Sequence, residues 1–227
     1  RFTCFIVKKS KLLIFCFLFL FHLKFYVGLL LVPATTGYLW IIKQKGPHPI
    51  IKTILNFAIY YSIAVIWHLY NLNWSLFTVL KWKRQDFLGL AESMNAKSLI
   101  ETGNLENTPI SFLQNFSWGL FNAIVRPLPW EVYSIVLLPN AIENCLIILF
   151  IFICLVYGKR KNFQSIGYFF LMYAFALLTI IGMVTPIMGS LVRYKIPAIP
   201  FLLMFFLLFM EKEKGKKLTS LFNKRTA

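Results

Sequence analysis

Charged residues, and acidic residues above all, are scarce in this chain of 227 residues. Charged side chains make up 14% of the sequence, whereas 59% of the residues are hydrophobic and 18% are aromatic, and the mean hydropathy is +0.70. Soluble domains use about 25% charged and about 45–50% apolar residues, so this composition excludes an ordinary soluble domain. The chain is predicted to be an all-α polytopic transmembrane protein.

Cysteines and signature motifs are scarce as well. The sequence has four cysteines and no Cys-x-x-Cys pair, which indicates neither a disulfide framework nor a metal site. Its three histidines, His22, His48 and His68, lie far apart and show no ligand spacing. The sequence contains no Gly-x-Ser-x-Gly, no P-loop and no Gly-x-Gly-x-x-Gly. We therefore expect no metal and no cofactor.

Against eight acidic residues stand 24 lysines and arginines, which give a net charge of +16. The cations cluster beside apolar runs at 8–11, 43–45, 159–161 and 212–217. This pattern is typical of topology signals and of contacts with anionic lipid, so we expect a membrane-lipid partner and no nucleic acid. The positive-inside rule then places the loop 158–165 and the tail 211–227 in the cytoplasm, and residues 185–195 and 71–131 together on the other face.

Five apolar stretches are long enough to suggest spans, since one span needs about 20 residues. They lie at about 12–32, 50–70, 132–157, 167–184 and 196–210, with a kink or an interfacial turn expected after Pro33. We predict four regions: membrane helices in 1–70, an extracytoplasmic region with interfacial helices in 71–131, a three-helix membrane region in 132–210, and a basic tail in 211–227. Because the first residue is Arg rather than Met, further helices are expected upstream.

The region 71–131 contains two predicted helices. Asp86 is expected to cap a helix that runs to about Ile100, and Thr108 with Pro109 is expected to begin the next one. Four apolar residues recur every four positions in the second helix: Phe112, Phe116, Leu120 and Ile124. This amphipathic pattern suits a helix lying on the membrane surface.

The stretch 189–200 places two cations and a tyrosine between two apolar runs. Arg193, Tyr194 and Lys195 sit at the mouth of a predicted membrane helix, where charge must face water, a phosphate or a carboxylate. One interpretation is an anion site, because an arginine fork and a lysine point charge both bind phosphate. The other is anchoring at the membrane interface, where such residues are common. Both interpretations stay open at this point.

Glu143 is a carboxylate within the third predicted span. A lone charge in the membrane is costly, so this side chain must be paired or protonated. It is either a catalytic or gating acid, or a structural partner of Lys24 or Asn144. The sequence leaves both interpretations open.

Arg126 and Glu131 bracket a turn rich in proline. The simpler interpretation is that they pair with each other, and the alternative is that Arg126 shares an anionic ligand with Arg193. Three acids, Asp86, Glu131 and Glu143, remain candidates for a catalytic base.

Three short motifs carry a resemblance: Arg193-Tyr-Lys-Ile-Pro-Ala-Ile-Pro200, Arg126-Pro-Leu-Pro-Trp-Glu131 and Glu143-Asn144. Over roughly residues 110–210 the chain resembles bacterial membrane proteins of polysaccharide assembly. It looks most like the C-terminal part of integral-membrane glycosyltransferases that use polyprenyl-phosphate sugars. The resemblance implies that Arg193 contacts a lipid-linked phosphate. The acidic first loop that carries the catalytic Asp of such enzymes is missing from these residues and is expected upstream.

The leading hypothesis is a protein of cell-envelope glycan synthesis in the bacterial inner membrane. It would act as a transferase or polymerase on a polyprenyl-phosphate-linked saccharide, whose phosphate would be bound by Arg193 with Tyr194, Lys195 and Arg126. One alternative is a transporter or flippase, suggested by Glu143 and Lys24 and by expected breaks at Pro33 and Pro139. A second alternative is a membrane scaffold without catalytic function.

Overall fold

The computed structural model describes residues 22, 25–44, 48–96, 98–100, 103–132, 134–157 and 165–209. Within these residues the chain forms eight α-helices: α2 (Phe25–Lys43), α3 (Pro49–Tyr70), α4 (Leu76–Ser93), α5 (Pro109–Val125), α6 (Leu138–Tyr157), α7 (Ser165–Val184), α8 (Met188–Lys195) and α9 (Ile199–Phe209). Two short 3₁₀ helices, η1 (Pro129–Glu131) and η2 (Ile135–Leu137), lead into α6. The predicted all-α class is confirmed, whereas the tail 211–227 lies outside the described residues.

Helix length and composition identify an integral membrane protein. Four helices, α2, α3, α6 and α7, are long and apolar enough to cross a bilayer. A fifth span requires α8 and α9 together, which bend by 57° at a short break. With 11 residues, α9 is about 16 Å long and cannot cross a hydrocarbon core of about 30 Å alone. The predicted span at 196–210 therefore has the wrong bounds. Helix α9 begins only at Ile199, and a span here would also have to include the eight residues of α8.

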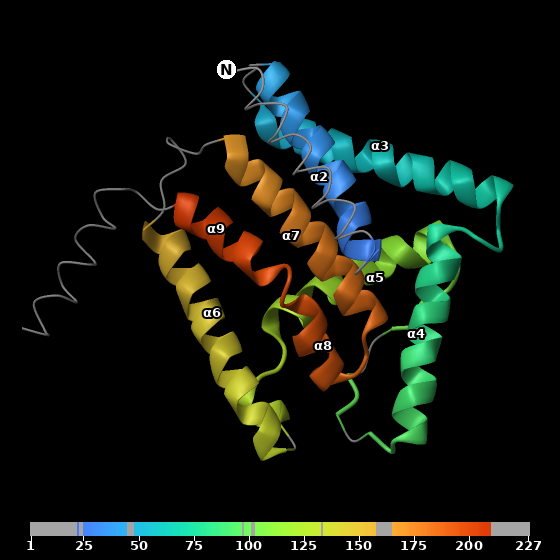
Figure 1. Ribbon diagram of the computed structural model, residues 1–227, viewed down its shortest axis with the longest axis vertical. Helices are drawn as coiled ribbons and strands as arrows, with labels where there is room; N and C mark the ends of the chain where they lie inside the picture. Colours follow the sequence, from blue (N-terminus) through green and yellow to red (C-terminus); the bar gives the residue numbers. More distant parts are fainter. Residues whose placement is uncertain are drawn as a thin grey trace, which may run out of the picture.

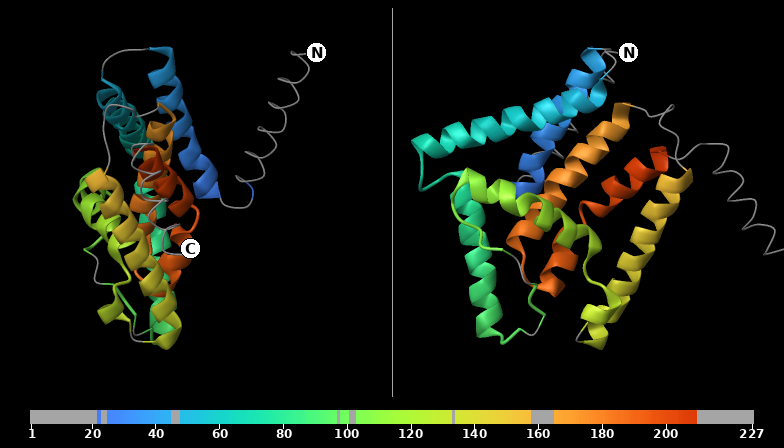
Figure 2. Two further views of the ribbon diagram at one scale, coloured as in Figure 1. Left: turned by 90° about the vertical axis from the view of Figure 1, so that its left-hand side faces the viewer. Right: turned by 180° about the vertical axis from the view of Figure 1, so that it is seen from behind.

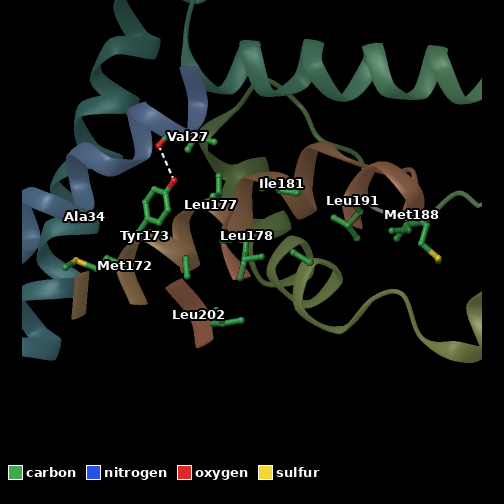
Figure 3. Packing of buried hydrophobic residues seen from close by; sticks show 14 of the residues in the cluster. Val27, Ala34, Met172, Tyr173, Leu177, Leu178, Ile181, Met188, Leu191 and Leu202 are labelled. Carbon is green, nitrogen blue, oxygen red and sulfur yellow. Dashed lines mark hydrogen bonds between the residues drawn. The ribbon is translucent and has the colours of Figure 1, made fainter. Parts of the chain in front are cut away.

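Helix α7 lies at the centre of the molecule (Figure 1). It packs against α2, α5 and α9, and more lightly against α3, α4 and α8. Buried apolar side chains line it on several sides, and Figure 3 shows Tyr173, Leu177 and Leu178 among them. The Tyr173 hydroxyl donates a hydrogen bond to the Val27 carbonyl of α2 at 3.4 Å. The core is thus built around one apolar helix that is enclosed by its neighbours.

Helix α5 crosses α7 at a pair of glycines, and Figure 2 shows this crossing from behind. A Cβ placed on Gly182 would overlap the Gly119 carbonyl oxygen and would lie 3.1 Å from the Ala123 Cβ. A Cβ on Gly119 would overlap the Met183 side chain. Small residues at such positions let two helix backbones approach closely, which is how membrane helices gain packing energy.

Helix α2 continues through Pro33 to Lys43, so the turn expected after Pro33 is wrong. Hydroxyl groups support this part of the helix, because Thr35 Oγ1 donates to the Leu31 carbonyl at 2.8 Å. From α3, Asn56 Nδ2 donates to the Pro33 carbonyl at 2.8 Å, and the Asn56 side chain is buried. The Asn56 bond ties α3 to α2 beside the proline, whereas the carbonyl that the missing Pro33 N–H leaves without its usual donor is that of Leu29.

Of the two helix N-caps predicted in the region 71–131, one is wrong and one is confirmed. Ser75 caps α4 by accepting a hydrogen bond from the Thr78 N–H at 3.2 Å, and Asp86 lies on an exposed face in the middle of that helix. The cap predicted at Asp86 is therefore wrong. The cap predicted at Thr108 is confirmed, since its Oγ1 accepts from the Ser111 N–H at 3.2 Å.

Pro139 and Glu143 lie closer to the beginning of their helix, α6, than the sequence predicts. Pro139 is the second residue of the helix, where its missing N–H costs nothing, so it does not break the span. Glu143 follows in the second turn, near the beginning of the helix instead of deep within it, and its side chain is exposed. Of the two breaks expected to favour a transporter, neither interrupts its helix.

The polar region and the segment before α8 meet directly. Leu99 and Ile187 form an isolated antiparallel bridge, in which the Ile100 N–H donates to the Pro186 carbonyl at 2.7 Å and the Met188 N–H donates to the Ser98 carbonyl at 3.1 Å. Residues 98–100 and 186–188 therefore lie side by side.

We predict that Gly182→Ala destabilises the protein, because its Cβ would overlap the Gly119 backbone and force α5 away from α7. Overpacked sites lose about 1–3 kcal/mol and occasionally more. The melting temperature of the purified protein in detergent should fall clearly. Gly89→Ala is the control, since no atom lies within 4 Å of the added Cβ. Equal melting temperatures for the two variants would contradict the close crossing.

Candidate functional site

Lys195 is the most deeply buried cation of the stretch that the sequence singles out. It ends α8 with 4% of its surface exposed, and it shares the inner side of the α8–α9 segment with Leu191, Ala198 and Leu202. Arg193, two residues earlier, is exposed. A helix turns by about 100° per residue, so side chains two positions apart point in nearly opposite directions. The Lys195 side chain is therefore enclosed by the protein, whereas the Arg193 side chain is on the surface.

The ammonium group of Lys195 is held by three oxygen atoms. Its Nζ donates to the Asn144 Oδ1 at 2.6 Å, to the Arg126 carbonyl at 2.9 Å and to the Ala123 carbonyl at 3.4 Å. Ala123 would normally receive the N–H of the residue four positions later, but that residue is Pro127, which has none. Lysine supplies the missing donor at the negative end of the α5 dipole.

Asn144 completes this arrangement from α6. Its side chain is 2% exposed, and Nδ2 donates to the Val125 carbonyl at 2.6 Å and more weakly to the Pro127 carbonyl at 3.5 Å. One amide group thus accepts from Lys195 and donates to the end of α5. The C-terminal end of α5, the beginning of α6 and the end of α8 are joined at this point, which we call the lysine clamp (Lys195, Asn144 and the carbonyls of residues 123–127).

A cavity of about 230 Å³ adjoins the lysine clamp. The wall contributed by α6 faces the break between α8 and α9, and Figure 1 shows α9 between α6 and α7. Four of the lining residues are polar: Asn140, Glu143, Asn144 and Lys195. The other four are apolar: Ile147, Val192, Ile196 and Ile199. The cavity therefore offers charge and amide groups beside a hydrocarbon wall.

Among the described residues, no carboxylate lies within ion-pair distance of the buried Lys195 ammonium. In the part of the chain that the structure describes, ion pairs within 4 Å join Lys83 to Asp86 and Arg126 to Glu131. Glu143 lies on the same cavity as Lys195, but no oxygen of its carboxylate comes within 4 Å of the ammonium. Three neutral oxygens stabilise the ammonium, and the Lys195 side chain also lines the cavity.

The predicted pair of Arg126 with Glu131 is confirmed. The Arg126 Nε lies 3.3 Å from the Glu131 Oε1, within ion-pair distance though without hydrogen-bond geometry. Glu131 Oε2 also accepts a hydrogen bond from the Leu128 N–H at 3.2 Å. Arg126 therefore contributes its carbonyl to the lysine clamp, while its guanidinium group fixes the turn before η1.

The remaining candidate residues lie elsewhere. Tyr194 packs its ring against Tyr26 and Phe87, at centroid distances of 6.4 and 5.6 Å. Asp86 is exposed on α4 and pairs with Lys83 at 3.2 Å. Neither Tyr194 nor Arg193 lines the cavity, so the structure brings together Lys195, Glu143 and the Arg126 carbonyl from the expected set. The alternative partner of Glu143, Lys24, lies outside the described residues.

Two asparagines of the site were not singled out for their function by sequence reasoning. Asn140 and Asn144 are four residues apart on α6, which places both on one side of the helix. Lys195 lies four residues after Leu191 and three before Ala198, a spacing typical of a buried stripe. Arg193 does not share this spacing, so the helical period by itself distinguishes the two cations.

Comparison with protein-family models, curated proteins and solved structures found no match. Function must therefore be inferred from the geometry of the lysine clamp and its cavity.

We predict that Lys195→Met destabilises the protein, because Met fills the space but leaves three oxygens without their donor. Buried polar groups that lose their partner cost about 1–3 kcal/mol each. A fall in the melting temperature in detergent would show this loss. Arg193→Met removes an exposed cation from the same helix and should change the melting temperature little. A larger effect at position 193 than at position 195 would contradict the assignment of the clamp.

Proposed function

We propose that this protein takes part in cell-envelope glycan assembly in the bacterial inner membrane, and that it binds a polyprenyl-phosphate-linked saccharide as a transferase or polymerase. The observation that carries the proposal is the cavity beside a buried ammonium group that has no carboxylate within 4 Å among the described residues. The phosphate of the substrate would bind next to Lys195.

Electrostatics supports an anionic ligand at this place. A buried charge is normally paired, because removal from water is costly and neutral groups compensate it only in part. Charges also interact more strongly where the surroundings are less polar than water. A phosphate oxygen in the cavity would supply the missing negative charge and form a charge-assisted hydrogen bond.

The apolar side of the cavity supports a lipid carrier. Ile147 on α6 and Ile199 on α9 line the cavity beside the polar groups. Pockets for whole small molecules measure about 300–1,000 Å³, so a cavity of about 230 Å³ suits a headgroup whose chain remains outside. The prenyl chain would lie along α6 and α9, which are both apolar.

This proposal changes the residue that the family resemblance implies for the phosphate. Arg193 is exposed, and the guanidinium group of Arg126 is paired with Glu131. Lys195 is the cation of the same motif that lines the cavity. We therefore assign the phosphate contact to Lys195, with Arg126 acting only through its carbonyl.

A transporter or flippase is a second candidate, for one specific reason. The cavity lies where α8 and α9 are interrupted and bend by 57°. Discontinuous helices often frame the substrate sites of transporters. Transport of a lipid-linked substrate would use the same headgroup cavity, and it would differ from catalysis in leaving the substrate chemically unchanged.

We predict that a photoreactive polyprenyl phosphate labels the protein in lipid nanodiscs, and that the matching polyprenol labels it far less. Lys195→Gln keeps a hydrogen-bond donor but removes the charge, so labelling by the phosphate should fall about tenfold or more. Quantitative mass spectrometry of the labelled protein measures both ratios. Equal labelling by phosphate and polyprenol would overturn the proposed site.

A second variant tests the cavity without touching Lys195. Ile147→Trp should fill the cavity and suppress labelling, whereas Leu149→Trp on an exposed part of α6 should leave it unchanged. Peptide mapping should place the label on α6 or α9. Undiminished labelling of the Ile147 variant would show that the substrate binds elsewhere.

A further inference from the structure

The cavity has charges of opposite sign on its wall. Lys195 is contributed by the end of α8, Glu143 by the second turn of α6, and the amide of Asn140 lies on the same wall. We infer, on the basis of the proposed function, that the bound headgroup is zwitterionic. It is a phosphate ester that carries a primary ammonium group, with the phosphate at Lys195 and the ammonium at Glu143.

Glu143 makes a purely anionic headgroup a poor match. A phosphate drawn to Lys195 would come close to the Glu143 carboxylate, because both residues line one cavity of about 230 Å³. Like charges at such short range repel each other, most strongly where water is partly excluded. An ammonium group on the same ligand removes this repulsion and forms an ion pair with Glu143.

If Glu143 formed an ion pair with Lys195, neither charge would be left for a ligand to neutralise. The two side chains attract each other, yet their charged atoms stay more than 4 Å apart. The ammonium group is instead held by Asn144 and two carbonyls on the side of α5. Both charged side chains line the cavity without forming an ion pair, so a ligand with complementary charges can contact both.

Hydrogen-bonding groups for this ligand are also present. The contact of Lys195 with the Ala123 carbonyl is the longest of the three, at 3.4 Å, so a phosphate oxygen can share this donor in a bifurcated hydrogen bond while the carbonyl keeps its partner. Within the described residues the Asn140 amide makes no hydrogen bond, although it is half-buried. Its N–H groups can donate to the phosphate, and its oxygen can accept from the ammonium.

Two sources supply this chemistry: a phosphoethanolamine lipid and the phosphate of an amino sugar. The experiment uses one matched pair of probes for each source. Phosphatidylethanolamine is compared with its N-acetylated form, and glucosamine 1-phosphate is compared with N-acetylglucosamine 1-phosphate. Acetylation keeps the phosphate and removes the ammonium charge. Binding is measured by native mass spectrometry of the protein in nanodiscs, and by isothermal titration for the soluble sugars.

The wild-type protein should bind the free amine of at least one pair more tightly than its acetylated form, by about fivefold or more. Glu143→Gln should abolish this preference and leave binding of the acetylated form equal or stronger. Glu92→Gln is the control, because this exposed carboxylate on α4 does not line the cavity. An unchanged melting temperature of the Glu143 variant shows that the fold is intact.

The possible failures are distinguishable. If wild-type protein binds the free and acetylated forms of both pairs equally, and Lys195→Gln weakens all of them, the zwitterionic headgroup is overturned and the phosphate site stands. If no phosphate probe binds and polyprenyl phosphate labels no better than polyprenol, the proposed function fails as well. A preference that survives in Glu143→Gln would also overturn the inference.

Discussion

A lysine ammonium group that occupies the unfinished end of a helix is the interaction on which the rest of this structure depends. Pro127 lacks the N–H that would close the last turn of α5, and Lys195 reaches the free Ala123 carbonyl from α8. In a membrane, each backbone group without a partner costs several kcal/mol, so an external donor is strongly favoured. Because the donor also carries a charge, closing the helix places a buried cation beside the cavity.

The position of this clamp depends on the glycine crossing of α5 and α7. The Gly119 carbonyl lies so close to Gly182 that α5 can move little along α7. The end of α5 lies about two turns beyond this contact, and α8 follows α7 after a short connection. Two elements that are tied to one central helix therefore bring Lys195 and the α5 carbonyls together. Tight packing of α5 would also suit a scaffold, but the cavity beside its end favours a ligand.

The sequence predicts the parts that depend on local chemistry. Long apolar helices, the cap at Thr108 and the short-range pair of Arg126 with Glu131 require few neighbours, and the structure contains four helices apolar and long enough to span, the cap and the pair. The prediction of a cap at Asp86 is wrong because α4 begins earlier, with Ser75 as its N-cap. The hydrogen bond that Asn56 donates to α2 comes from another helix, and the clamp joins residues up to 72 positions apart. Such contacts follow from packing, which no local pattern specifies.

Arg193 and Lys195 belong to one motif but lie in different surroundings. An exposed guanidinium group on α8 can meet lipid headgroups or water without further support, whereas a buried ammonium group needs a built set of acceptors. These acceptors belong to the protein and hold Lys195 in place before any ligand arrives. Under the proposed function, a phosphate in the cavity would meet a charge whose side chain is already ordered, so little conformational entropy would be lost on binding. The clamp that completes α5 would thereby also order the proposed phosphate site.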